Sequence, residues 1–293
     1  MIASLPRAAW LRTATALYVA AFLIFLFVPL VIVATFAFND APYPAPPWRG
    51  FTLDWFTGNP ASGRVGLFHD VALLGSIWTS VVVACWVTAL SVAVGTANAF
   101  LMERYRFFCK GALSVLMLAP LVIPGVILGI SILSLSSRIA DLALAWFDVE
   151  LDFLRPGLPL VVLGQFAYIA TIATLMISAR LKRFDRTLEE AALNLGASHA
   201  AVLYKVTFPY LRPALIGSAA ISFLMSFENF NTTLMLVGAD PPLTVMMYGR
   251  MREGATPVLN AVSLFLMLAS ALLALTLMRG GTRSAPGSPA AGA

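Results

Sequence analysis

Charged residues are scarce in this sequence of 293 residues. Asp, Glu, Lys and Arg together make up 11% of the chain, whereas soluble domains carry about 25%. Hydrophobic residues make up 60%, and the mean hydropathy is +0.87. The shortage of charge excludes a water-soluble monomer, and it also excludes intrinsic disorder, which needs self-repulsion and solvation. The composition therefore predicts a membrane protein.

Cysteine and histidine are equally scarce, with two of each. Cys85 lies inside an apolar run and Cys109 in a polar segment, so a disulfide between them is not expected. His69 and His199 fall on opposite sides of the predicted membrane, which excludes a histidine metal site or a Ser-His-Asp triad. The sequence also has no G-x-x-x-x-G-K-[ST] loop, so this chain does not hold nucleotide phosphates in the P-loop manner. We expect no catalytic residue, no metal and no cofactor.

Long apolar runs are the dominant feature of the chain. A membrane-spanning helix needs about 20 mostly apolar residues, because each residue rises about 1.5 Å through a hydrocarbon core about 30 Å thick. The runs lack the alternation of barrel strands. They predict an all-α protein with six transmembrane helices, approximately from Leu17 to Phe38, Val71 to Met102, Ala112 to Leu135, Gly157 to Ala179, Ala214 to Val237 and Val258 to Met278.

The first run follows Arg7 and Arg12, an arrangement that is also typical of a cleaved signal peptide. The run is longer than a signal core and five more follow it, which favours a retained span. We therefore divide the chain into an N-terminus of residues 1–16, a transmembrane region of residues 17–279 and a tail of residues 280–293. The tail is rich in Gly, Ser and Pro, and we expect it to be disordered.

The basic residues indicate the orientation, because cytoplasmic loops are enriched in Lys and Arg. With six spans, thirteen of the nineteen basic residues fall on one side, together with both termini, which we therefore predict to be cytoplasmic. This asymmetry explains the pI of about 9.5 without a nucleic-acid partner. The thirteen are Arg7, Arg12, Arg104, Arg106, Lys110, Arg180, Lys182, Arg183, Arg186, Lys205, Arg212, Arg279 and Arg283.

The cytoplasmic loop of residues 180–212 has the pattern of two short helices. Thr187 and Glu190 fit a capping box. In this motif the threonine hydroxyl satisfies one free backbone N–H at the start of the helix, and the glutamate side chain reaches back to satisfy another. Gly196 fits the end of this first helix, since glycine adopts the left-handed conformation without a Cβ penalty. We therefore predict a helix that ends in a turn at Gly196.

The second helix of the loop is predicted to start at Ser198, whose hydroxyl can cap it. Val202, Leu203 and Val206 share one face, and Pro209 is expected to end the helix. The apolar face needs a partner, which is either another protein or the chain's own bundle. The pattern alone does not decide between these alternatives.

The same loop resembles the EAA loop of ATP-binding-cassette importer permeases, E-A-A-x3-G-x9-[IV]-x-[LF]-P. The matching residues are Glu190-Ala191-Ala192, Gly196, Val206 and Phe208-Pro209. The resemblance implies a type I importer permease fold and a coupling helix, from about Gly196 to Val206, that docks on a separate ATPase subunit. It implies that Glu190 holds the shape of the loop and that ATP binds to the partner subunits. The coupling residues would be Glu190, Ala191, Ala192, Gly196, Ala197, Ser198, Val202, Val206 and Pro209.

Shorter segments along nearly the whole chain look like the second permease of spermidine/putrescine importers. This resemblance implies a polyamine or a related small solute, and a bacterial inner-membrane location. It also implies a second homologous permease subunit and a solute-binding protein as partners, in addition to the ATPase and the membrane lipid. The segments are Phe27-Val28-Pro29-Leu30, Phe38-Asn39, residues 51–56, residues 104–107, residues 180–185 and residues 256–261.

The fifth apolar run contains a polar island around Glu228. An ionised carboxylate in the middle of a membrane costs at least about 2.5 kcal/mol, so it normally faces a partner or a wet cavity. On a continuous helix, Glu228, Asn231 and Thr232 would share one face. Together with Asn229 they predict a lining for the route of a polar cation, although polar residues also hold neighbouring helices together. The resemblance implies two adjacent acids at this point in many polyamine permeases, whereas this sequence has Glu228-Asn229 with one acid. This difference weakens the assignment of a polyamine as the substrate.

Two other spans carry candidate pathway residues. In the third span, Pro120 and Pro124-Gly125 remove backbone donors and should loosen the helix, either as a lining element or as a packing kink. In the fourth span, Gln165 and Tyr168 lie one turn apart and could line the same route. A short re-entrant helix is expected at residues 245–251.

The prediction is therefore a permease subunit that works by alternating access, driven by separate ATPases. The alternatives are a permease of the same family for another small solute, a stand-alone ion-coupled transporter or channel and, third, an intramembrane enzyme. The EAA loop favours the importer, because a stand-alone transporter has no reason to carry it.

Overall fold

A computed structural model describes residues 9–58, 63–254 and 256–282, with side chains to Leu272. Within these ranges the chain is nearly all helical, and its extended pairing is limited to one isolated bridge between Asn39 and Phe51. The all-α prediction is confirmed. The predicted disordered tail falls mainly on residues 283–293, outside the described part, and residues 280–282 belong to the last helix.

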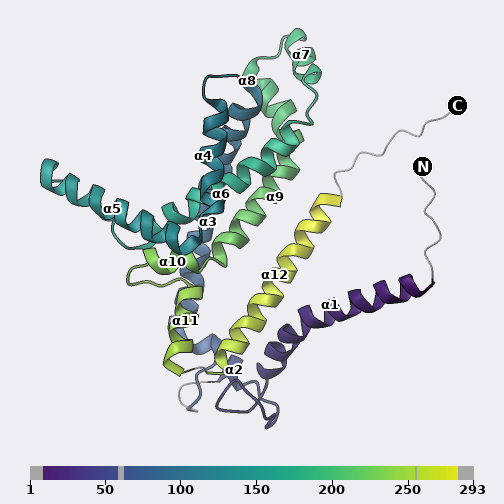
Figure 1. Cartoon of the computed structure of the whole chain (residues 1–293), viewed down its shortest axis with the longest axis vertical. Helices are drawn as coiled ribbons and strands as arrows, with labels where there is room; N and C mark the ends of the chain where they lie inside the picture. Colours follow the sequence, from purple (N-terminus) through teal and green to yellow (C-terminus); the bar gives the residue numbers. More distant parts are fainter. Residues whose placement is uncertain (1–8, 59–62, 255, 283–293) are drawn as a thin grey trace. The chain divides into compact units, whose positions relative to one another are not determined.

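The chain forms two compact units. The first contains residues 1–71 and 250–271, and the second contains residues 72–249 and 272–293. The helices of the first unit are α1 (Ala9–Phe36), α2 (Asp54–Thr57), the 3-10 turn η2 (Leu67–His69) and most of α12 (Val258–Thr282) (Figure 1). The second holds α3 (Val71–Arg104), α4 (Lys110–Val122), α5 (Gly125–Phe147), η3 (Asp152–Leu154), α6 (Leu158–Leu181), α7 (Thr187–Asn194), α8 (His199–Val202), η4 (Leu203–Thr207), α9 (Phe208–Phe227), α10 (Asn231–Leu236) and α11 (Leu243–Gly254).

In the first unit, the segment after α1 is held by polar contacts. Trp55 is buried and donates its indole N–H to the carbonyl of Asn39 over 2.8 Å. Arg64 stacks over the Trp55 ring and pairs with Asp40 at 2.5 Å. Arg250 makes a two-armed ion pair with Asp70. These contacts give a definite structure to a segment that its Pro and Gly content marks as a loop.

In the second unit, α6 is the central helix and packs against α9, α10 and α4. Glycine allows the closest approaches: a Cβ on Gly95 of α3 would lie 2.9 Å from the Ala173 side chain, and one on Gly164 would lie 2.2 Å from Leu236. The apolar core of this unit consists of Val83, Val87, Leu160, Val161, Ile169 and Leu236.

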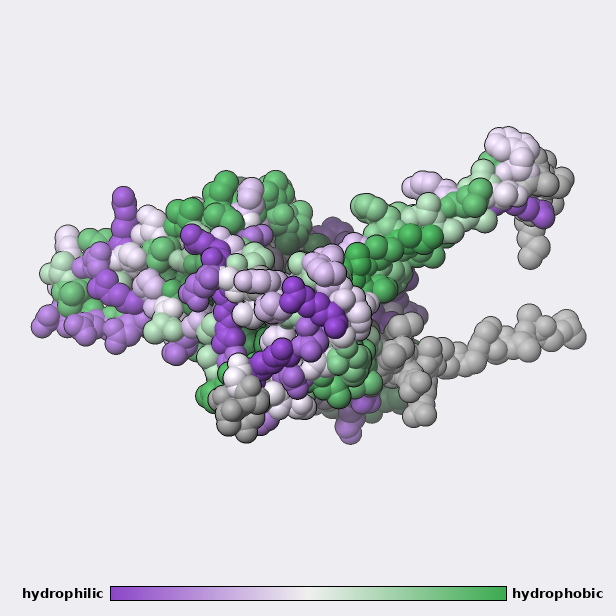
Figure 2. Space-filling model, turned by 90° about the horizontal axis from the view of Figure 1, so that it is seen from below, coloured by the Kyte–Doolittle hydropathy of each residue, from purple (hydrophilic) through white to green (hydrophobic). Residues whose placement is uncertain are grey.

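Five helices are long and apolar enough to cross a membrane: residues 10–36, α3, α5, α6 and residues 199–227. Two shorter apolar helices are α4 and residues 258–272, the described part of α12. Large apolar side chains are exposed along these helices (Figure 2). Phe25, for example, is 79% exposed and Trp78 is 68% exposed. Such surfaces are suited to lipid or to other membrane helices.

The predicted third span, Ala112–Leu135, is wrong as a single helix, because the chain bends between α4 and α5 (Figure 1). Ile123 is extended, with ψ 128°, as expected for a residue before proline. Pro124 has no N–H to continue the helical ladder. The loosening expected at Pro124 is thus a complete break, which hydropathy alone does not register.

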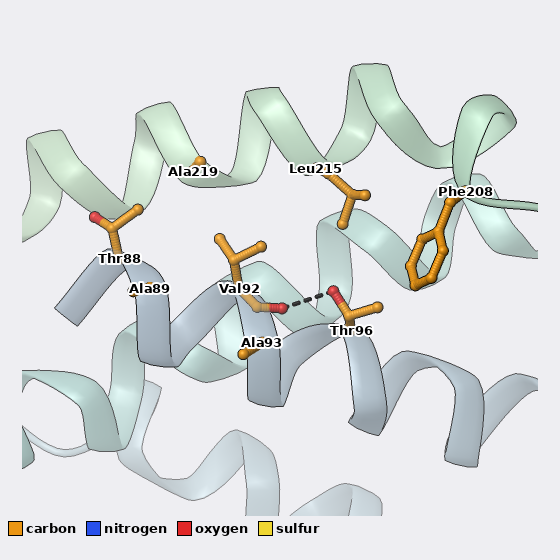
Figure 3. Close-up of a pocket in the computed structure, with 8 residues that line it drawn as sticks. All are labelled: Thr88, Ala89, Val92, Ala93, Thr96, Phe208, Leu215 and Ala219. Atoms are coloured by element: carbon orange, nitrogen blue, oxygen red, sulfur yellow. Dashed lines mark hydrogen bonds between the residues drawn. The ribbon is translucent and has the colours of Figure 1, made fainter. Parts of the chain in front are cut away.

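A groove of about 540 Å³ separates α3 from α9 (Figure 3). Its walls are mainly apolar. The hydroxyl of Thr96 is satisfied by the Val92 carbonyl of its own helix at 2.6 Å, and the buried hydroxyl of Thr88 has no hydrogen-bond partner among the described residues. A groove of this chemistry does not suit a polar solute.

Candidate functional site

The fifth predicted span also consists of two helices. α9 ends at Phe227, Glu228 and the next two residues are not helical, and α10 starts at Asn231. The expectation that Glu228, Asn231 and Thr232 share a face of one helix is therefore wrong. The physical reason is Asn229, whose Oδ1 accepts the backbone N–H of Thr233 at 3.1 Å and so takes the place of a main-chain carbonyl.

The structure brings some of the predicted pathway residues together. Gln165 of α6 is 1% exposed, and its amide donates to the hydroxyl of Thr233 over 2.8 Å. Tyr168, one turn later, accepts from the Asn229 amide at 2.5 Å. The break in the fifth span is thus attached to the central helix by side-chain hydrogen bonds.

The other predicted pathway residues are placed differently. Thr232 is buried and donates to the carbonyl of Gly125, at the start of α5, over 3.3 Å. Glu228 and Asn231 are exposed in this single chain. Their side chains are therefore available to whatever lies beside the break.

A cavity of about 300 Å³ lies where the two broken spans meet α6. Pro120 and Gly125, both expected near the pathway, are on its wall, whereas Glu228 is not. Its lining residues are Pro120, Leu121, Ile123, Gly125, Leu128, Tyr168, Ile172, Met225, Asn229, Asn231 and Thr232. The break between α4 and α5 and the polar break between α9 and α10 therefore border one cavity.

Sequence reasoning did not select three residues that hold this region. Ser226 donates to Gln165 Oε1 at 2.5 Å, and Thr233 bonds to both Gln165 and Asn229. Thr244, on α11, donates to the backbone carbonyl of Asn229 over 2.8 Å. Ser226 and Thr233 belong to the polar island, which was a usable signal, but nothing in the sequence pointed to Thr244.

The helix α11 was expected at residues 245–251 and is longer, at Leu243–Gly254. The ring of Tyr248 packs against Phe230 with centroids 5.0 Å apart. Through Thr244 and Tyr248, α11 thus contacts Asn229 and Phe230, the non-helical residues that separate α9 from α10.

In the loop of residues 180–212, the predicted capping box is wrong. Thr187 is the first residue of α7, and Asp185 caps it by accepting from both the backbone N–H and the hydroxyl of Thr187, at 3.0 and 2.8 Å. The backbone bond and then the side-chain bond hold the pKa of Asp185 below its usual value. An aspartate two residues earlier therefore performs the role predicted for the threonine.

The turn at Gly196 is confirmed. Gly196 has φ +85°, and it donates to the Leu193 carbonyl while Ala197 donates to Ala192, which together form a Schellman motif. The cap of the second helix is also confirmed, since Ser198 Oγ accepts from the Ala201 N–H at 3.3 Å.

The end of the second helix is not at Pro209. The chain continues as a helix from His199 through a π turn at Leu203–Thr207 into α9. A π turn shifts the hydrogen-bond partner by one residue, which accommodates the missing N–H and the ring of Pro209 in the first turn of α9. The loop is thus rigidly continuous with the broken fifth span.

The acid that ties this loop to the bundle is Glu189, while Glu190 is exposed. Arg104, at the end of α3, binds Glu189 with two nitrogens at 2.6 and 2.8 Å, and Thr207 donates to the same carboxylate at 2.5 Å. Burial opposes ionisation of Glu189, but these bonds and the charges of Arg104 and Arg186 outweigh it and lower the pKa of the carboxyl. We call this contact the Glu189 clamp.

Apolar side chains remain uncovered on the loop. Leu195 is 89% exposed and Tyr204 is 70% exposed, on either side of the Gly196 turn. A turn held this firmly, with apolar groups on its outer surface, has the properties of a docking element.

The match to known proteins decides the family. The model of the binding-protein-dependent transport system inner membrane component matches residues 91–286, which include the loop, the cavity and both broken spans. The chain belongs to this family. It is therefore a multi-pass inner-membrane component of a transport system, in a family of transporters rather than of enzymes.

Individual relatives of this chain are also permease proteins of transport systems. It is 26% identical over 245 residues to the putrescine transport system permease protein PotI of Escherichia coli K12, covering 83% of this chain and 82% of that protein. It is 28% identical over 254 residues to the spermidine/putrescine transport system permease protein PotC of Haemophilus influenzae, covering 86% and 90%.

The fold has a solved counterpart. A bacterial ABC transporter involved in the import of the acidic polysaccharide alginate contains a chain with a TM-score of 0.72 and 17% identity, covering 94% of this permease and 96% of that chain. The fold predicted from the resemblance, that of an importer permease, is therefore confirmed.

Proposed function

We propose that this permease forms half of the membrane pathway of an ATP-binding-cassette importer for a small amine-bearing solute, with polyamines such as putrescine and spermidine as the first candidates. The observation that carries the proposal is the meeting of two broken spans at one polar cavity. Irregular backbone at membrane depth is tolerated where it is packed in protein or lines a wet space. The names of the relatives supply the solute class.

The proposed pathway residues divide by position. Gln165, Tyr168, Asn229 and Thr232 build the wall and its supports, and Asn231 is an exposed residue on the same wall, whereas Glu228 is exposed and lies off it. A second, homologous permease placed against these exposed residues would complete the route, and Glu228 would then attract the cationic solute. This arrangement explains why an acid that is costly in a membrane is left exposed in a single chain.

The proposed drive comes from separate ATPase subunits at the loop. Residues from Gly196 to Val206 dock on the ATPase, with Ala191, Ala192, Ala197 and Val202 as supporting positions and Ser198 as the cap. Because α8, η4 and α9 are one continuous helix, a push on the loop reaches the break at Glu228 directly. The protein lies in the inner membrane with both termini in the cytoplasm, and a solute-binding protein delivers the solute from the other side.

The decisive test is Glu228→Gln in the assembled transporter. We expect uptake of labelled putrescine to fall at least tenfold, because the amide keeps the size of the side chain and removes its charge. Co-purification of the ATPase should be unchanged. The matched control is Glu150→Gln, an exposed acid in the loop between α5 and α6. Wild-type uptake by Glu228→Gln would remove this residue from the mechanism.

A further inference from the structure

Five polar side chains around the cavity form one continuous line of hydrogen bonds, which we call the polar relay. It starts on α9, crosses to α6, passes through α10 and the break, and returns to α6. The links, in order, are Ser226 Oγ to Gln165 Oε1 at 2.5 Å, Gln165 Nε2 to Thr233 Oγ1 at 2.8 Å, Thr233 Oγ1 to Asn229 Oδ1 at 2.9 Å and Asn229 Nδ2 to Tyr168 Oη at 2.5 Å.

The direction of the last link is fixed by the backbone. The N–H of Thr233 can only donate, and it lies 3.1 Å from one terminal atom of the Asn229 side chain. That atom must be the oxygen, so the NH₂ group of Asn229 faces Tyr168. An amide NH₂ has hydrogens to give and no acceptor, so the phenol oxygen of Tyr168 accepts in this bond.

The directions of the other hydrogen bonds in the relay follow from the position of the Asn229 oxygen. The Thr233 hydroxyl faces the Asn229 oxygen, which carries no hydrogen, so the hydroxyl donates to it. The Thr233 oxygen must then accept from Gln165, which places the nitrogen of the Gln165 amide there and its oxygen toward Ser226. Ser226 donates to that oxygen. Every hydrogen in the relay therefore points toward Tyr168.

The consequence lies at the end of the relay. A phenol has one hydrogen, and Tyr168 does not use it toward Asn229. The structure records no acceptor for that hydrogen among the residues that it describes. Tyr168 and Asn229 both line the cavity of about 300 Å³, so this cavity has on its wall a hydroxyl whose hydrogen is not given to Asn229.

We propose that the Tyr168 hydroxyl is the donor of a solute subsite, and that the transported amine also carries a hydrogen-bond acceptor, such as a hydroxyl, carbonyl or carboxylate group. The proposal rests on the solute permease function proposed above, and within small amine-bearing solutes it moves the first candidates from simple polyamines to amines that also carry an acceptor. A protonated amine has only donor hydrogens and cannot accept from Tyr168. A solute made of ammonium groups alone therefore leaves this donor unpaired, whereas an amine with an acceptor satisfies both Glu228 and Tyr168.

The proposal also assigns a role to the amide at position 229. With an aspartate there, the carboxylate would accept from Tyr168 and turn its hydrogen away from the cavity. The wall would then offer a phenol oxygen instead of a hydroxyl hydrogen. Asn229 is thus a positioning residue that sets which kind of group the subsite takes.

The test compares two probes in the complete transporter reconstituted in proteoliposomes with its binding protein. Putrescine and 4-aminobutan-1-ol share a four-carbon chain, and the second replaces one ammonium with a hydroxyl. The variants are Tyr168→Phe and Asn229→Asp, with Tyr18→Phe on the exposed surface of α1 as the control. Each uptake rate is divided by the wild-type rate for the same probe, so selection by the binding protein cancels.

We expect Tyr168→Phe to lower uptake of 4-aminobutan-1-ol by about threefold to tenfold, the effect of one hydrogen bond, and to change putrescine uptake less than twofold. Asn229→Asp should shift the ratio of the two probes in the same direction. An equal loss for both probes, or a larger loss for putrescine, overturns the proposal and leaves the amine permease function standing.

If the wild-type transporter takes up neither probe, the proposed solute class is contradicted. A second measurement then tests the donor role of Tyr168 independently of the solute. The infrared C–O stretch of the Tyr168 phenol, isolated by subtracting the Tyr168→Phe spectrum, distinguishes an accepting from a donating phenol. We expect the accepting form in wild type and a change to the donating form in Asn229→Asp. A band that Asn229→Asp does not move overturns the inference about Tyr168.

Discussion

Single side chains, rather than backbone ladders, hold the two functional regions of this permease together. The Glu189 clamp joins α7, α3 and the π turn through one carboxylate whose side chain is 18% exposed. At the break between α9 and α10, the Asn229 side-chain amide likewise joins two elements, because it bonds to Tyr168 of α6 and to Thr233 of α10. In both places one polar group joins several elements, so its removal should be felt beyond its own helix.

Removing the charge of the clamp tests this idea. Glu189→Gln should destabilise the loop by about 1.5–3 kcal/mol, the range for hydrogen bonds to charged groups, and lower the melting temperature of the purified complex. Arg104→Gln should have a similar effect, and the double variant should cost much less than the sum. Additive effects in this double-mutant cycle would show that the two residues do not act as a pair.

The clamp also predicts a pH dependence. The pKa of Glu189 is lowered from its ordinary value of 4.5 in the folded protein. Its contribution to stability is therefore fully present above that value and is lost as the pH falls through the lower, folded pKa. Wild type should lose more stability than Glu189→Gln in that acidic range, measured as melting temperature against pH. Parallel curves for the two proteins would contradict this prediction.

The helices show how far sequence reasoning reached. The apolar runs identified the helical spans, because length and hydropathy decide membrane insertion. The loosened helix expected at Pro124 is a complete break in the structure, whereas the break at Asn229 was not predicted, because the sequence does not tell a side chain that replaces a main-chain carbonyl from an ordinary polar residue. The resemblance implied that Glu190 holds the shape of the loop, whereas Glu189 makes the clamp, and choosing between adjacent acids requires knowing where Arg104 lies. Gly196 and Ser198 were found because their cap signals are local.

The turn at Gly196 provides a test at the scale of this element. Gly196→Ala should destabilise the loop by roughly 1–2 kcal/mol, because φ +85° is strained for any residue with a Cβ. The matched control is Gly111→Ala in α4. Added Cβ atoms at both positions meet nothing within 4 Å, but Gly111 lies in a helix and favours alanine.

The readouts are the melting temperature and retention of the ATPase during purification. We expect Gly196→Ala to lower both, while Gly111→Ala leaves both unchanged or improved. Equal behaviour of the two variants would show that the left-handed turn is not needed for docking.

At the scale of the whole molecule, the charge pattern predicts how the chain lies in the membrane. The basic residues of the loop from Arg104 to Lys110 and of the loop that carries Gly196 belong to the same side, which the positive-inside rule assigns to the cytoplasm. The ATPase consumes cytoplasmic ATP, so the proposed coupling loop has to be on this side. Orientation and function thus depend on each other in this permease, and one measurement bears on both.

Cys109 makes that measurement possible without adding a new residue on the cytoplasmic side. It is a free, exposed cysteine directly before α4. In a Cys85→Ser background, a membrane-impermeant maleimide should label Cys109 in inside-out vesicles and leave it unlabelled in intact cells whose outer membrane has been permeabilised. A variant with Val149→Cys, an exposed position between α5 and α6, and with Cys109→Ser should show the opposite pattern. Labelling of Cys109 from outside would reverse the orientation, and a loop on that face could not receive force from an ATPase that uses cytoplasmic ATP.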